Sequence, residues 1–236
     1  MKAHKLKMRR DCFFRMLGKY DLLNKRRRGK PQTTDSNDPM KKYPDLIKNL
    51  VPGRPDQLWV SDITYLELCN EYAYLSLVTD AYSRKIVGFH VSESLTAEGS
   101  MLALKMALEG RRNNEGLIHH SDRGTQYCCN EYIKLLQGNN IDISMTQSGD
   151  PRDNAIAERI NGILKTELLK PVFTDVDSAR AAVTQAVNIY NYLRPLSSIS
   201  MLTPALVHTR KFNLKRCWRN NYKKGPINGR YRSDSY

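Results

Sequence analysis

Three acidic residues stand where a carboxylate is costly to bury and useful for chemistry. Asp62 lies in an apolar run and, because alternate strand residues share a face, points to the same side as Val60 and Thr64. Asp122 follows the segment LIHHS, at the end of a predicted strand, where open α/β sheets bind ligands; taken alone, it would also suit a cap for the next turn. Glu158 lies on a predicted helix. An unpaired buried carboxylate needs a hydrogen-bond donor, a cation or a metal ion, so the three are candidates for a charged site.

The helix that carries Glu158 presents a row of polar side chains beside its apolar stripe. The stripe consists of Ile156, Ile160, Ile163, Leu164 and Leu168. Glu158, Asn161 and Lys165 fall on a neighbouring face, because seven residues at about 100° each return to within about 20° of the starting direction. Alone, such a row is typical of a solvated helix surface. Its combination with Asp62 and Asp122 favours a site.

The order of the predicted elements places Asp62 and Asp122 in one sheet and Glu158 on a helix beside it. Three strand-like runs begin at Leu58 and are joined by short polar links, which implies antiparallel neighbours. Helix and strand patterns then alternate through the strand before Asp122, a helix ended by Gly138 and the helix of Glu158. The order βββαβαβα predicts an α/β fold with a mixed five-stranded sheet flanked by helices.

The segments on either side of this body have a different composition. The apolar spacing of residues 11–23 predicts one amphipathic helix, and a proline-rich stretch follows it. A last helix is predicted around 176–192, from the capping-box-like sequence TDVD to the residues before Pro195. The chain is therefore predicted to divide into a helical basic segment, a linker, a folded core and a basic tail, over residues 1–30, 31–55, 56–204 and 205–236.

The net charge of +14 is concentrated at the two ends of the chain. Residues 1–54 hold 16 Lys and Arg against 5 Asp and Glu, and residues 205–236 hold 9 against 1. Such dense basic runs indicate contact with nucleic-acid phosphates, with solubilising tails as the alternative. No apolar run approaches the ~18 residues of a membrane span. The five cysteines include no CxxC pair, so we expect neither a disulfide framework nor a zinc ribbon.

Neighbouring histidines and cysteines offer a competing metal site. His119 and His120 precede Asp122, and Cys128 and Cys129 follow it. Adjacent cysteines diverge and chelate one ion poorly, which disfavours zinc. We expect His119 in the core and His120 in support of the site.

Three further polar residues are interpreted as structural. Asp80 is predicted to form a turn before Ser83-Arg84 rather than to act as a fourth ligand. Asp153 and Asn154 are predicted to cap the helix of Glu158 rather than to bind a metal.

The motifs around the candidate carboxylates resemble those of one family. Asp62, Asp122 and Glu158 follow a D,D-35-E pattern, with 35 residues between the second and the third and Lys165 seven residues later. The surrounding words are WVSDITY, DAYSRKIVGF, HSDRGTQY, DNAIAERINGILKTEL and YNYLRP. Over about residues 55–205 the chain resembles the OrfB transposases of bacterial insertion sequences of the IS-three type, which have a DDE core like that of retroviral integrases.

The resemblance implies an RNase H-like fold and a polynucleotidyl transferase that cleaves and joins DNA during transposition. It implies that Asp62, Asp122 and Glu158 bind two Mg²⁺ or Mn²⁺ ions. Hard oxygen ligands suit Mg²⁺, and two such ions can polarise an attacking oxygen and stabilise the leaving one. The residues expected to contact DNA are Lys165, Asn161, Arg123 and Gln126. For Arg123 and Gln126, local packing is the alternative.

Partners and location also follow from the resemblance as expectations. They are DNA at the element ends and the target, a homo-oligomer assembled on DNA, and the bacterial cytoplasm with its nucleoid. The helix-turn-helix of this family is typically encoded in an upstream frame, so we expect a frameshift fusion or a partner chain that supplies it. Leu196 stands after Arg194-Pro195, where relatives commonly have histidine.

Two other functions fit parts of the sequence. One is a regulatory protein that binds element ends without cutting them. The other is an RNase H-like nuclease or junction resolvase, which would share the metal site but cut without joining. Detection of a joined product discriminates the transposase from both.

Overall fold

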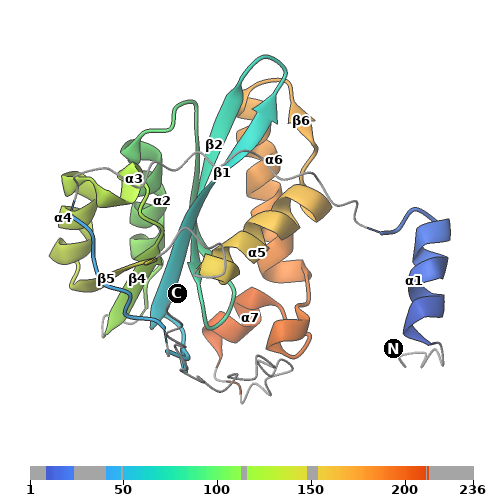
Figure 1. The fold of residues 1–236 in the computed structure, drawn as a ribbon, viewed down its shortest axis with the longest axis horizontal. Helices are drawn as coiled ribbons and strands as arrows, with labels where there is room; N and C mark the ends of the chain where they lie inside the picture. Colours follow the sequence, from blue (N-terminus) through green and yellow to red (C-terminus); the bar gives the residue numbers. More distant parts are fainter. Residues whose placement is uncertain are drawn as a thin grey trace, which may run out of the picture.

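One sheet with helices on both of its faces forms the body of the computed structural model (Figure 1). The structure describes residues 9–23, 41–48, 50–112, 116–147, 154–210 and 212. The strands are β1 Leu58–Leu68, β2 Tyr72–Asp80, β3 Ile86–Ser92, β4 Leu117–Ser121, β5 Ile141–Met145 and β6 Val172–Phe173. The helices are α1 Arg10–Lys19, α2 Ala97–Glu109, α3 Thr125–Cys128, α4 Asn130–Gly138, α5 Ala155–Ile163, α6 Val176–Asn188 and α7 Pro204–Thr209.

The sheet has the strand order β3-β2-β1-β4-β5, and β6 pairs with β1 beyond the end of β4. The pairs β1·β2 and β2·β3 are antiparallel, whereas β1·β4 and β4·β5 are parallel. The predicted mixed sheet of five strands in the order βββαβαβα is therefore confirmed. The two-residue strand β6 is an addition, because two residues are too few to show the period-two pattern by which strands are predicted.

Alternate residues of β1 face different helices. Trp59 packs with buried residues of α2 and α4, whereas Leu66 packs with buried residues of α5 and α6. Val60 shares a cluster with Ala157 of α5. Asp62, on the face of Val60 and Leu66, is thereby directed to the side of the sheet that α5 covers.

The helix predicted around Glu158 is present and ends in a wider turn. Helix α5 continues as a π-helical segment, Leu164–Leu168, which contains Lys165. The last predicted helix is also present, as α6 and the π-helical segment Ile189–Leu193. Asp175 and Ser178 form the capping box that TDVD suggested.

The ends of the folded body extend beyond the predicted boundaries. In the predicted linker, the carbonyl of Pro44 accepts a hydrogen bond from the Met145 amide, so residues near Pro44 lie along β5. Helix α7 buries Val207 and His208, so folded structure continues past residue 204 into the predicted tail. Helix α1 is shorter than predicted and buries none of its residues. Among the described residues, no helix is both long and apolar enough to cross a membrane.

Candidate active site

Asp62 is the electrostatic centre of the predicted site. It lies half-buried on β1, and its Oδ2 accepts a hydrogen bond of 2.7 Å from Nδ2 of Asn161 on α5. Burial and, after it, the negative charges of Asp122 and Glu158 raise the pKa of Asp62 to about 7, although hydrogen bonds from Asn161 and the Ile63 backbone act in the opposite direction. The three predicted carboxylates therefore lie close enough to repel one another, and we call Asp62, Asp122 and Glu158 the open site.

The register of the parallel strands explains why Asp62 and Asp122 meet. The pairing of β1 with β4 ends where Val60 lies opposite His120. Two residues further along each chain come Asp62 and Asp122, which therefore stand at the same level and on the same face.

Asp122 also shapes the turn that follows it. Its Oδ1 accepts a hydrogen bond of 2.9 Å from the Gly124 amide, so it does have the turn-capping contact that its sequence context allowed. A Cβ added to Gly124 would lie 3.0 Å from this oxygen, so the tight turn favours glycine. Burial raises the pKa of Asp122 above its ordinary value, which indicates that one backbone donor does not offset the cost of the charge.

The polar row of α5 lies along β1. Asn161 donates to Asp62, and one turn further Nζ of Lys165 donates to Oγ1 of Thr64 at 2.8 Å. Glu158 is exposed at the start of this row. The row that the sequence could not distinguish from a solvated surface is thus in contact with the strand of Asp62.

The other two predicted DNA contacts have protein partners. Nη2 of Arg123 donates to Oε1 of Gln147 at 2.9 Å, and Nε2 of Gln126 donates to the Leu95 carbonyl at 3.1 Å. These contacts fit the local packing that was the alternative for both residues. Their roles in DNA binding stay predictions.

The capping prediction for Asn154 is wrong. Asn154 occupies the position before α5, but within the described residues its side chain makes no capping hydrogen bond. Its Nδ2 instead donates to the carbonyl of Ser61 at 2.8 Å, because the side chain is buried against β1 rather than turned back to its own helix. Asp153 lies outside the described residues.

The histidines next to Asp122 belong to the interior. Nε2 of His119 lies 2.8 Å from the Ser61 hydroxyl and 2.9 Å from the Tyr132 hydroxyl. Complete burial lowers the pKa of His119 to about 3, so its ring is neutral. Nδ1 of His120 lies 2.9 Å from the hydroxyl of Ser144 on β5. His119 is therefore a core residue, as predicted.

The cysteines contact sulfur or backbone rather than the histidines. Sγ of Cys128 lies 3.8 Å from Sδ of Met145, and Sγ of Cys129 lies 3.4 Å from the Gln126 carbonyl. Among the described residues, no cluster with metal-binding distances contains them, so the zinc alternative has no support.

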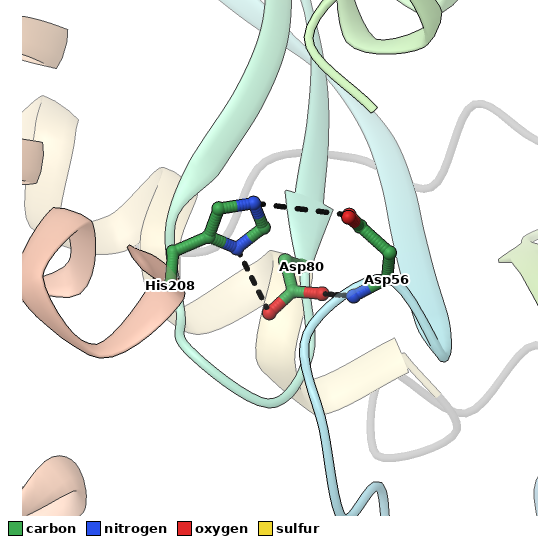
Figure 2. A group of neighbouring side chains, drawn as sticks. All are labelled: Asp56, Asp80 and His208. Atoms are coloured by element: carbon green, nitrogen blue, oxygen red, sulfur yellow. Dashed lines mark hydrogen bonds and ion pairs between the residues drawn. The ribbon is translucent and has the colours of Figure 1, made fainter. Parts of the chain in front are cut away.

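A second group of charged side chains lies at the start of β1, and sequence reasoning missed it (Figure 2). Asp56, Asp80 and His208 are buried, and one potential ligand atom of each lies within 4.8 Å of the others. His208 Nε2 is 3.8 Å from Oδ1 of Asp56, and its Nδ1 is 3.7 Å from Oδ1 of Asp80. We call these three residues the closed cluster. His208 is 128 residues or more from its partners in sequence, so only the Thr203-Pro204 helix start signalled that its segment was folded.

Protein donors already surround the carboxylates of the closed cluster. Oδ1 of Asp80 accepts from the amide and the hydroxyl of Ser83, and Oδ2 accepts from the Asp56 amide. The predicted turn-forming role of Asp80 is thus confirmed. Oδ1 of Asp56 accepts from Nε1 of Trp59 at 3.1 Å, and Oδ2 accepts from the Arg112 amide at 3.3 Å.

Nearby cations add to this balance, because both Asp56 and Asp80 interact electrostatically with Lys85. A metal ion would have to displace these donors. The closed cluster therefore fits a metal poorly, although its spacing would allow one. The open site has the opposite character, because its ligand atoms do not all meet the 4.8 Å spacing. Asn161 and the Gly124 amide compensate its charges only in part, since the pKa of Asp62 and that of Asp122 both stay raised.

Comparison with protein families places both aspartates and the glutamate in matched regions. Residues 52–151 match a family described as integrase core domain, and residues 139–204 match a second family with the same description. The first match contains Asp62 and Asp122, and the second contains Glu158.

Relatives of this chain are proteins of insertion elements. An uncharacterized 31 kDa protein of insertion element IS600 from Shigella sonnei is 35% identical over 199 residues, which are 83% of this chain and 73% of the relative. A putative transposase of IS986/IS6110 from Mycobacterium tuberculosis is 35% identical over 71% of this chain. Transposase InsF of IS3A from Escherichia coli is 36% identical over 67%. The chain spans 63% of the mycobacterial protein and 56% of InsF.

Two solved structures of retroviral proteins have a similar fold. The intasome of simian T-cell lymphotropic virus, in complex with a PP2A regulatory subunit, contains a chain that matches 80% of this one with a TM-score of 0.58 and 19% identity, over 66% of its own length. The HTLV-2 integrase catalytic core domain, in complex with magnesium, matches 66% of this chain and 97% of its own, with a TM-score of 0.52 and 19% identity. These matches confirm the predicted RNase H-like fold.

Proposed function

Because this chain belongs to the integrase-core family of insertion-sequence transposases, which are DDE polynucleotidyl transferases, we propose that it cleaves and joins DNA strands in a metal-dependent reaction. The observation that carries the proposal is the raised pKa of Asp62, to about 7, beside Asp122 and Glu158. Burial and two neighbouring negative charges make the ionised Asp62 costly unless a cation balances it.

The donor atoms of the open site fit a hard divalent cation. Asp62, Asp122 and Glu158 offer carboxylate oxygens, the ligands that Mg²⁺ prefers. Oδ1 of Asn161 is buried and has no hydrogen-bond partner among the described residues, so a further oxygen lies beside Asp62. We propose that the three carboxylates hold Mg²⁺ or Mn²⁺, two ions in the fully loaded site. When bound, such ions polarise the attacking oxygen and stabilise the leaving oxygen at the phosphate.

The residues of the chain position the reactants, and none of them attacks the phosphate. In the proposed first step, water attacks the phosphodiester at the element end and releases a 3′-hydroxyl. In the second step, that hydroxyl attacks another DNA phosphate, so one bond breaks as one forms. Asn161 keeps Asp62 directed at the site through its 2.7 Å hydrogen bond, and Asp122 is held by the Gly124 amide.

Contacts with DNA are proposed for the polar side chains that surround the carboxylates. Lys165 lies one helical turn beyond Asn161 and would attract a phosphate next to the site. Arg123 directly follows Asp122 and Gln126 lies four residues after it; both would contact the DNA strand if they release their present protein partners. The basic segments 1–30 and 205–236 would hold DNA further away; the structure describes residues 9–23 of the first and residues 205–210 and 212 of the second.

Assembly and location complete the proposal. We propose a homo-oligomer on DNA, because two element ends must be brought together, and action at the bacterial nucleoid. A helix-turn-helix region, in a fusion or in a partner chain, stays an expectation of the family resemblance.

The test is a strand-transfer reaction with the purified chain. A pre-nicked, labelled element end and a target plasmid are incubated with Mg²⁺ or Mn²⁺, and Glu158→Ala serves as the matched variant. We expect metal-dependent joined product that the variant fails to make while it still binds DNA. Retained turnover in the variant would contradict the proposed site. Cutting without joining would favour the nuclease, and binding without cutting would favour the regulatory protein.

A further inference from the structure

Asn154 joins the two elements that carry Asp62 and Glu158. Its side chain is 7% exposed, and its Nδ2 donates to the Ser61 carbonyl at 2.8 Å across 93 positions of sequence. Ser61 directly precedes Asp62 on β1. Asn154 precedes Glu158 by four residues, which is about one turn and about 6 Å of helix rise.

The Ser61 carbonyl lies where β1, still paired with β2, has no strand on its other side. Pairing of β1 with β4 ends at Val60, and pairing with β6 begins at Glu67. Between these points an outward carbonyl has no strand to bond on that side, and a buried carbonyl without a donor is costly. Asn154 supplies the donor just past the end of the β4 ladder.

The hydrogen bond has no role in capping its own helix. The described part of the chain shows no capping hydrogen bond from Asn154, although asparagine is a preferred residue at this position. The side-chain amide of Asn154 therefore donates to the backbone of β1 instead of to its own helix. Further along α5, Asn161 bonds Asp62 and Lys165 bonds Thr64, so Asn154 makes the first of three successive contacts between the helix and the strand.

We propose that Asn154 is a positioning residue, whose hydrogen bond to the Ser61 carbonyl fixes the first turn of α5 and so sets where Glu158 stands relative to Asp62. The inference rests on the proposed function for the meaning of that placement. Residues that orient metal ligands typically change metal affinity about 10-fold to 100-fold when they are removed.

A second asparagine provides a matched control. Asn191 is 4% exposed, and its amide bonds both the amide and the carbonyl of Ile86 at 3.0 Å. It likewise anchors a helical segment to a strand backbone, but it joins the π-helical segment Ile189–Leu193 to β3 rather than α5 to β1. Asn191→Ala should therefore disturb packing as Asn154→Ala does, but it should leave the contact between α5, the helix of Glu158, and β1 intact.

The experiment measures the first turn of α5 and the metal affinity separately, in the full chain. In metal-free protein, Asn154→Ala should raise amide hydrogen exchange over residues 158–161, whose amides close the first turn of α5, whereas Asn191→Ala should leave this turn protected. In Mn²⁺ titrations followed by calorimetry, Asn154→Ala should weaken binding about 10-fold and Asn191→Ala less than about 2-fold. Thermal melting of both variants checks that they are folded.

The possible outcomes separate this inference from the proposed function. Unchanged exchange over residues 158–161 overturns the inference, and so does an equal loss of Mn²⁺ affinity in both variants. Increased exchange with unaltered Mn²⁺ affinity also overturns it, because the contact would then not place Glu158. Absence of any Mn²⁺ binding in the parent chain overturns the metal site of the proposed function, and with it the role of Asn154 in placing a ligand.

Discussion

The open site and the closed cluster are two groups of ionisable side chains near strand β1, and their charges are balanced to different extents. In the closed cluster, Asp56 and Asp80 accept hydrogen bonds from backbone amides, a hydroxyl and an indole, and His208 packs between them. In the open site, the amide of Asn161 is the side-chain donor that offsets the charge of Asp62, and burial together with two carboxylates raises the pKa of Asp62.

Under the proposed function, charge balance distinguishes the metal site from the closed cluster better than the spacing of ligand atoms does. The closed cluster has the tighter spacing, yet each of its carboxylate oxygens is already used. The open site has the wider spacing, and its charge excess is what a divalent cation would relieve. We infer that the closed cluster joins the entry to β1, the end of β2 and α7, whereas the open site is kept free for chemistry.

The largest expected effect is the loss of catalysis when the open site loses one charge. Asp62→Asn should reduce strand joining by at least roughly 10³-fold, because it removes a proposed metal ligand. The same change should not lower the thermal stability of the metal-free chain, because it relieves repulsion with Asp122 and Glu158. Strand-transfer assays and thermal melting measure the two effects. A variant that is both inactive and strongly destabilised would contradict this division.

The same type of residue should behave differently in the closed cluster. Asp80→Ala should lower the free energy of unfolding by about 3–5 kcal/mol, because it breaks a buried charged network and leaves the donors of Ser83 and Asp56 unpaired. Denaturant unfolding measures this loss. As a control, the unfolding measurement is repeated with a chelator, which should not change this loss of stability, because we place no metal ion in the closed cluster. A loss below about 1 kcal/mol would show that the closed cluster does not stabilise the fold.

The pH dependence of stability should reveal the unbalanced charge. Unfolded Asp62 loses its proton near pH 4, whereas the folded group keeps it up to about pH 7. Between these values the native chain holds the extra proton, so the contribution of Asp62 to stability falls as pH rises and levels off above about 7. The stability of Asp62→Asn relative to the parent chain should therefore increase as pH rises across this window, by roughly 1–2 kcal/mol after allowance for solvent screening.

Unfolding curves from pH 4 to pH 8, with and without Mn²⁺, test this expectation. Mn²⁺ should remove the part of the pH dependence of stability that is due to Asp62, because the bound cation balances the ionised carboxylate. A parallel pH dependence of the parent chain and Asp62→Asn would argue against a raised pKa.

The smallest expected effect concerns DNA affinity next to the open site. Lys165→Ala should weaken DNA binding a few-fold and reduce the slope of log affinity against log salt by about one, because one phosphate contact is lost. Lys134→Ala, on the exposed surface of α4, is the matched control and should leave both quantities unchanged. Binding isotherms at several salt concentrations decide between them. An unaltered slope would remove Lys165 from the proposed DNA surface.

Much of the fold was predictable because its signals are local. The period-two pattern of β1, the apolar stripe of α5 and the TDVD cap of α6 each depend on residues a few positions apart. The spacing of Asp62, Asp122 and Glu158 can also be recognised in the linear sequence, and with the motifs around them it led to the family and the RNase H-like fold. Their roles as ligands stay predictions.

The contacts that were missed join residues far apart in the chain. The two-residue strand β6 and the partner of Asn154 cannot be found in a local pattern, because Ser61 lies 93 positions from Asn154. Asp56 and His208 are ordinary residues in sequence and become a buried pair only when α7 packs at the start of β1.

The sequence by itself determined which elements form and which acidic residues belong to the family pattern, because periodicity and motif spacing are properties of the linear chain. Tertiary structure alone decided which carboxylates are balanced. Asp80 accepts hydrogen bonds from the amide of Ser83 in the following turn and from the amide of Asp56 just before β1. Asp62 instead lies near two like charges, one after β4 and one on α5. The cost of a charge depends on everything that surrounds it in space, and those surroundings exist only once the chain has folded.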